Sequence, residues 1–187
     1  MAGDDARAAA GGAPPGPLRI LIVGLGNPLL RDDGVGARAA GLLAARLAGS
    51  PVDVVESPWG GLRFLDLVSG YDRVIVVDAI TWRHSAPGTV YRLTPEQAVL
   101  AVRATSYHDL SLGAALALGR AVGAPLPEET VFFAVEAQEV ECFGETLTPA
   151  VEAALPEVVR RVEAQLMRWN VGRGEGEPCT KPPSRSI

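Results

Sequence analysis

The sequence has few aromatic residues, only two cysteines and no long apolar run. Aromatic side chains make up 5% of the 187 residues, whereas Ala, Val and Leu are abundant, so we expect an aliphatic core. Cys142 and Cys179 lack CxxC spacing, which excludes a disulfide framework and a cysteine-rich zinc module. No segment is apolar enough to cross a bilayer, and the acidic N-terminus lacks the basic and apolar regions of a signal peptide. We therefore expect a cytoplasmic protein.

Positive charge is also scarce. The net charge is −5, and no basic patch with interleaved aromatic residues occurs, which argues against binding to nucleic acid or to anionic membranes. The length fits one domain. Residues 1–17 and 171–187 are rich in Gly, Pro and small or polar residues, so we predict disordered tails on either side of a single domain at 18–170.

Predicted strands and helices alternate along residues 18–170. Continuous aliphatic runs predict buried strands at 18–23, 52–56, 74–78 and 131–135, and helices are expected to begin near residues 35, 62, 95, 106 and 149. Residues 89–93 alternate like an antiparallel edge strand. Pro156 is expected to kink or restart the last helix. This alternation predicts an α/β fold, a mainly parallel sheet with helices on both faces.

The first loop resembles a dinucleotide-binding turn but departs from it. Gly24 and Gly26 follow a strand and precede a helix, yet Leu29 stands where the third glycine is expected. The loop then ends on two adjacent carboxylates, Asp32 and Asp33. A pyrophosphate there would meet like charge, at a cost of about 4 kcal/mol per close pair. We therefore disfavour a dinucleotide-binding oxidoreductase and expect no organic cofactor.

Two carboxylates are expected at one edge of the sheet. Asp33 lies in the loop after the first strand and Asp78 at the end of the third, and ligands bind where the carboxyl ends of parallel strands meet. Each has a structural alternative, because Asp32 or Asp33 would serve as a helix N-cap and Asp78 would accept bonds from a turn. Only one of the adjacent aspartates can be the cap, which leaves the other for a ligand.

His108 is the histidine best placed to join them. Ser106 and Asp109 fit a capping box, which puts His108 in the first turn of a helix predicted at 106–122. The helix dipole there disfavours the imidazolium and keeps the ring in the form that binds metal. The structural alternative is an ordinary surface histidine. The second histidine, His84, is expected in a solvated loop.

Two carboxylates and an imidazole suit nickel, zinc, manganese or iron. Three protein ligands leave coordination positions open for water or substrate. No HExxH, HxxEH or Gly-x-Ser-x-Gly motif occurs, and neither cysteine has an evident histidine partner, which argues against the common zinc, serine and cysteine hydrolases.

Four segments in order resemble the maturation endopeptidases of [NiFe] hydrogenases. They are residues 20–36 (ILIVGLGNPLLRDDGVG), 76–90 around VVDA and APGTV, 106–110 (SYHDL), and 143–151 from FG to LTPAV. The resemblance spans about residues 18–168. It implies a three-layer fold with a twisted, mainly parallel five-stranded sheet flanked by helices on both faces.

The resemblance also implies an activity. Members remove the C-terminal extension of the hydrogenase large-subunit precursor after nickel insertion, and their metal ligands fall on Asp33, Asp78 and His108. The nickel would be supplied by the substrate and would serve as the recognition element. Whether the chemistry is of aspartic or metallo type stays open, as does a non-proteolytic, metal-sensing chaperone of the precursor. We expect a monomer, with isoform specificity in residues 57–61 and 81–87.

Overall fold

The computed structural model describes residues 17–100 and 112–171. Five strands form one sheet in the order β2-β1-β3-β5-β4. Their bounds are β1 Ile20–Leu25, β2 Val52–Ser57, β3 Arg73–Ile80, β4 Val90–Leu93 and β5 Glu129–Glu136. Only β4 runs antiparallel to its neighbour, at the edge of the sheet, as its alternating sequence predicted. The predicted tails lie outside the described residues except for Pro17 and Val171.

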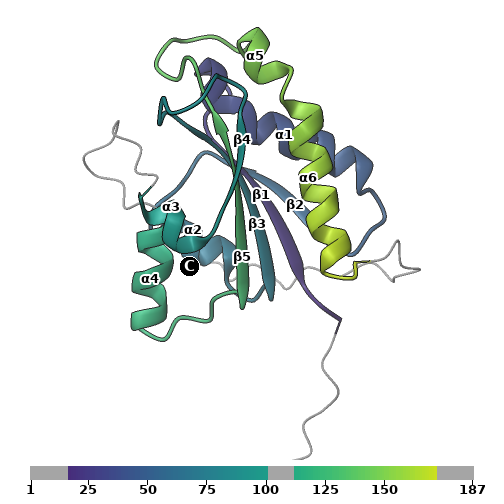
Figure 1. The fold of residues 1–187 in the computed structure, drawn as a ribbon. Helices are drawn as coiled ribbons and strands as arrows, with labels where there is room; N and C mark the ends of the chain where they lie inside the picture. Colours follow the sequence, from purple (N-terminus) through teal and green to yellow (C-terminus); the bar gives the residue numbers. More distant parts are fainter. Residues whose placement is uncertain (1–16, 101–111, 172–187) are drawn as a thin grey trace, which may run out of the picture.

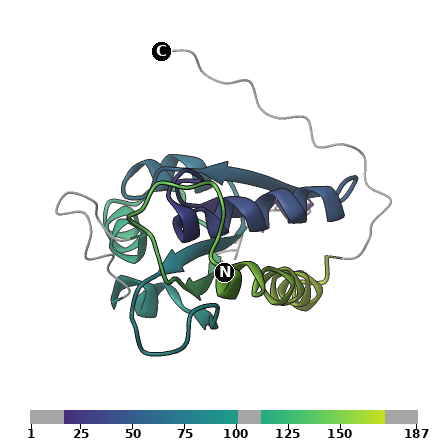
Figure 2. The same ribbon diagram turned by 90° about the horizontal axis from the view of Figure 1, so that it is seen from above.

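Helices cover both faces of this sheet (Figures 1 and 2). Helices α1 (Val35–Arg46), α5 (Pro149–Glu152) and α6 (Leu155–Arg168) pack on one face. Helices α2 (Arg63–Val68), α3 (Pro95–Leu100) and α4 (Leu112–Ala121) pack on the other. The prediction of a three-layer α/β fold is confirmed. No helix within residues 17–100 and 112–171 is long and apolar enough to cross a membrane.

The aliphatic run of β1 supplies both halves of the core. Ile20 and Ile22 pack beneath α1 and α6, whereas Leu21 and Val23 point to the face covered by α2 and α4. A strand buried on both faces has no need of polar alternation, which explains why its sequence reads as a continuous apolar segment.

Three local expectations need adjustment. Pro156 restarts rather than kinks the last helix, because α5 ends at Glu152 and Pro156 lies in the first turn of α6. Leu42, assigned to the buried face of α1, is 46% exposed, since the helix packs on the sheet through smaller residues such as Ala39. Strand β3 also continues two residues beyond Asp78, to Ile80.

The sheet has a topological switch point between β1 and β3. Their pairing ends at Gly24 and Val77, after which β3 stays paired with β5 alone. The chain leaves β1 through α1 toward β2, on one side, while β3 borders β5 on the other. Ligands of open α/β sheets bind at such a point, outside the carboxyl ends of the strands.

Candidate functional site

Asp33 lies in the loop that leaves β1, within a short 3-10 helix (η1, Arg31–Gly34). Its side chain is largely buried, and its Oδ2 accepts a 2.6 Å hydrogen bond from the backbone N–H of Asn27. The loop therefore folds back on itself and holds one carboxylate oxygen in place. Neither Asp33 nor Asp32 is the N-cap of α1, because Gly34 occupies that position and no side chain caps it.

The glycines of the dinucleotide-like motif are required for packing of the chain on itself. Gly26 has φ = 122°, and a Cβ there would overlap the Asp33 carbonyl. A Cβ on Gly24 would overlap the Gly36 carbonyl in the first turn of α1. In a dinucleotide site the corresponding glycine lets a pyrophosphate approach the backbone. Here the loop and α1 occupy that space.

Gly36→Ala is expected to destabilise the protein, although alanine normally favours a helix interior. The added Cβ would overlap the Leu25 and Val77 carbonyls, so α1 must shift away from β1 and β3. We expect a loss of about 1–3 kcal/mol in unfolding free energy by urea denaturation. Gly41→Ala in the same helix is the matched control, because its nearest new neighbour is a Glu56 oxygen at 3.6 Å. It should be neutral or stabilise by up to about 1 kcal/mol, and equal effects would contradict the packing argument.

Asp78 projects from β3 immediately after the β1–β3 pairing ends. It pairs with Ala134 of β5, is partly buried, and its Oδ1 accepts the Ala79 N–H at 2.8 Å. The prediction that Asp33 and Asp78 lie at the same edge of the sheet is therefore borne out by the topology, at the switch point. Their role as ligands stays a prediction.

The third predicted ligand, His108, lies outside the described residues, as do Ser106 and Asp109. In the part of the chain that the structure describes, no three His, Cys, Asp or Glu side chains gather into a group able to hold a metal ion. His84 is exposed in the loop after β3, where its ring centroid lies 6.2 Å from that of Trp82.

Asp32 has a structural role, but a different one from capping. Its side chain is completely buried and accepts hydrogen bonds from the backbone N–H groups of Gln138, Glu139 and Thr148, at 2.9, 3.0 and 2.6 Å. The Thr148 hydroxyl donates a fourth, at 2.9 Å. Asp32 thus joins the β1 loop to the loop after β5 and to the start of α5. The sequence rule of an N-cap was wrong here because the partners are 106 to 116 residues away.

Glu136 is a further buried acid at this edge that the sequence reading missed. It is the last residue of β5 and is 1% exposed. Its carboxylate accepts the Arg83 N–H at 2.9 Å and the Tyr91 hydroxyl at 3.3 Å. It therefore fastens the loop after β3 to the sheet. An acid at the end of an apolar strand is the same signal that identified Asp78, and it was available at residues 131–136.

Cys142 is poorly suited to act as a nucleophile. A hydrogen bond with Glu139, together with the charge of that carboxylate, raises the pKa of the Cys142 thiol above its usual value. The thiolate is the reactive form, so this environment lowers its population at neutral pH.

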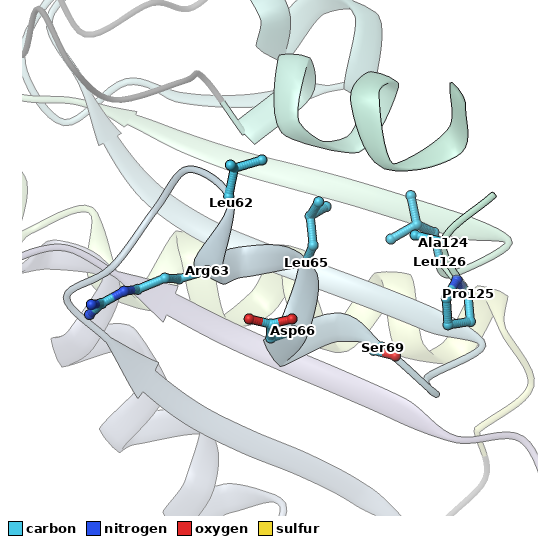
Figure 3. A pocket seen from close by; sticks show the side chains of 8 residues that line it. All are labelled: Leu62, Arg63, Leu65, Asp66, Ser69, Ala124, Pro125 and Leu126. Carbon is cyan, nitrogen blue, oxygen red and sulfur yellow. The ribbon is translucent and has the colours of Figure 1, made fainter. Parts of the chain in front are cut away.

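Two cavities lie outside the Asp33–Asp78 edge. One, of about 370 Å³, runs between α2 and the segment before β5, with Leu62, Leu65 and Leu126 among its lining residues (Figure 3). The other, of about 520 Å³, lies beside α1 and is bounded by Pro28 and Glu152. Neither is lined by Asp33 or Asp78, but Pro28 brings the second cavity next to the loop that carries Asp33.

Comparison with known proteins gives the family. The family model described as hydrogenase maturation protease (HycI) matches residues 37–165. The hydrogenase 2 maturation protease of Escherichia coli K12 is 31% identical over 157 residues, which cover 82% of this chain and 94% of that protein. The chain belongs to the hydrogenase maturation protease family. It is accordingly a hydrolase, as predicted.

Solved structures of maturation proteases share the fold. The hydrogenase maturating endopeptidase HybD from E. coli superposes with a TM-score of 0.70 at 28% identity, covering 81% of this chain and 94% of that one. The [NiFe] hydrogenase maturation protease HybD from Thermococcus kodakarensis gives a TM-score of 0.58 at 28% identity, covering 79% and 99%. The protease family and the α/β architecture predicted from the sequence are thus confirmed.

Proposed function

We propose that this maturation protease removes the C-terminal extension of a [NiFe]-hydrogenase large-subunit precursor once nickel has been inserted. The observation that carries the proposal is the convergence of Asp33 and Asp78 at the β1–β3 switch point of a chain in this family. The names of its relatives, a hydrogenase 2 maturation protease and a [NiFe] hydrogenase maturation protease, support the substrate class.

The metal in this proposal belongs to the substrate. Asp33, Asp78 and His108 would bind the nickel already held by the precursor, and two carboxylates with one imidazole form a donor set that suits this ion. Three contacts from the enzyme would position the nearby peptide bond, so that only a correctly loaded precursor is aligned for cleavage. Recognition and positioning would then depend on the same side chains.

Each residue has a distinct task in this scheme. Asn27 donates to the Asp33 carboxylate and holds it toward the edge. Asp32, fully bonded to backbone and hydroxyl donors, fixes the loop on which Asp33 lies and is not free to act as a base. The low positive charge and the two non-paired cysteines support action in the cytoplasm, and we propose that the enzyme acts as a monomer.

Mass spectrometry of purified precursor incubated with the enzyme tests the proposal. Nickel-loaded precursor should lose a C-terminal peptide, whereas apo-precursor should keep its full mass under the same conditions. Equal trimming of both forms would show that nickel is not what the enzyme recognises. An unchanged mass of both would overturn the substrate assignment. Precursor alone, without enzyme, controls for other proteases.

A further inference from the structure

Three large apolar side chains are exposed on loops at the carboxyl edge of the sheet. Leu29 follows β1 and is 50% exposed, Trp59 follows β2 and is 58% exposed, and Phe143 follows β5 and is 86% exposed. We call these three residues the apolar rim. Single exposed apolar residues are common, but a group of them around a functional edge marks an interaction surface.

Backbone hydrogen bonds join the three loops. The Gly144 N–H donates to the Leu29 carbonyl at 2.9 Å, which places Phe143 next to the Leu29 loop. The Gly26 N–H donates to the Ser57 carbonyl at 3.2 Å, which ties the same loop to the one that carries Trp59. The rim is therefore one connected surface rather than three separate side chains.

The rim is also held rigidly. The Ser57 hydroxyl accepts the Trp59 N–H at 3.2 Å, and the Arg63 guanidinium lies 4.6 Å from the Trp59 ring centroid. Asp32 fixes the start of the Phe143 loop through Gln138 and Glu139. Exposed aromatic residues on a preorganised support lose little entropy on binding, which favours them as anchors for a protein partner.

The rim is continuous with the candidate site. Leu29 and Asp33 belong to the same turn-rich loop, and Asp32 links that loop to the segment that presents Phe143. A polypeptide that reaches Asp33 from solvent therefore passes over the rim. Because the enzyme's reaction requires a polypeptide, the substrate is the natural occupant.

Charge specifies the kind of surface that fits. Residues 137–148 carry Glu139, Glu141 and Glu145 and no lysine or arginine. Glu141 and Glu145 are exposed beside Phe143. Arg31 and Arg63 lie at the inner side of the rim, against Gly144 and Trp59. The outer part is therefore apolar and acidic, which complements a partner segment that is apolar and basic.

We propose that the apolar rim binds an apolar, basic segment of the hydrogenase precursor next to the peptide bond that is cut. This rests on the proposed function and adds the surface by which the substrate is held besides its nickel. A second copy of the chain fits less well, since a symmetric contact would bring the glutamates of both Phe143 loops together.

Steady-state cleavage of nickel-loaded precursor by Phe143→Ser tests the proposal. We expect KM to rise about 10-fold, with kcat within about twofold of wild type, because the truncated contact is made before and during the reaction alike. Phe143 is almost fully exposed, so its replacement should not disturb the fold. Met167→Ser is the matched control. Met167 is 72% exposed in the last turn of α6, beside Trp169, whose indole bonds Glu129 at the opposite end of β5.

Charge is tested with the double variant Glu141→Gln, Glu145→Gln. The KM of the wild type should rise with NaCl concentration, and this dependence should be weaker in the double variant. An unchanged KM in Phe143→Ser, while wild type cleaves normally, would overturn the rim and leave the proposed function standing. A wild-type dimer that Phe143→Ser dissociates in sedimentation would assign the rim to a second copy and also overturn it. If wild type cleaves no precursor, the proposed function fails, and a direct binding measurement on the two proteins still decides the rim.

Discussion

Asp33→Asn is expected to lower kcat/KM for nickel-loaded precursor by at least about 100-fold. The amide keeps the shape of the side chain, and its oxygen can still accept the Asn27 N–H. What is lost is the negative charge and the second carboxylate oxygen that would reach the metal. The fold should therefore survive while cleavage disappears. Far-ultraviolet circular dichroism and the thermal midpoint monitor the fold, and mass spectrometry of the precursor measures cleavage.

Asp66→Asn is the matched control for this change. Asp66 lies on α2 and lines the cavity of Figure 3, away from the switch point, so the same chemical substitution there should leave cleavage unchanged. Asp78→Asn and His108→Ala should resemble Asp33→Asn, because the proposal gives all three the same task. Normal trimming by any one of them would remove that residue from the proposed ligand set.

Asp32→Ala should be among the most destabilising single substitutions in this protein. The change leaves three backbone N–H groups and a hydroxyl without their acceptor in a fully buried place, and it opens a small cavity. An unsatisfied buried donor costs about 1–3 kcal/mol, so a total of about 3–5 kcal/mol is expected after partial relaxation. For a domain of this size the thermal midpoint should fall by about 10 °C, which differential scanning calorimetry measures.

Thr148→Val provides the graded control for that prediction. It removes only the hydroxyl donor to Asp32 and keeps the Thr148 backbone bond, so a loss of about 1 kcal/mol is expected. If Asp32→Ala is no worse than Thr148→Val, Asp32 does not hold the loops together as its contacts indicate. Loss of cleavage in Asp32→Ala at full stability would instead assign Asp32 to the chemistry.

Local sequence patterns predicted the sheet because its strands are buried on both faces. The continuous runs of β1, β3 and β5 mark them clearly, and the alternation of β4 marks the edge. The position of Asp33 and Asp78 followed from the same argument, since strand order brings carboxyl ends together. The partners of Asp32 were not predictable in this way, because loops distant in sequence meet only when the sheet is assembled.

Exposure was the other property that the sequence concealed. Helical periodicity placed Leu42 on the buried face of α1, but the small residues of that helix form the contact with the sheet and leave Leu42 outside. The sequence gives no sign that Phe143 is exposed beside the Leu29 loop, since a backbone bond between residues more than a hundred positions apart puts it there.

The close contact of the Gly26 loop with Asp33 has a consequence for selectivity. A carboxylate held by Asn27, on a loop pressed against the end of β1, has little freedom to follow an ion of a different radius or coordination geometry. Folding has already met the entropic cost of placing it. Under the proposed function, such a rigid ligand would discriminate among divalent metals by fit, so a precursor loaded with the wrong ion would be misaligned rather than merely bound more weakly.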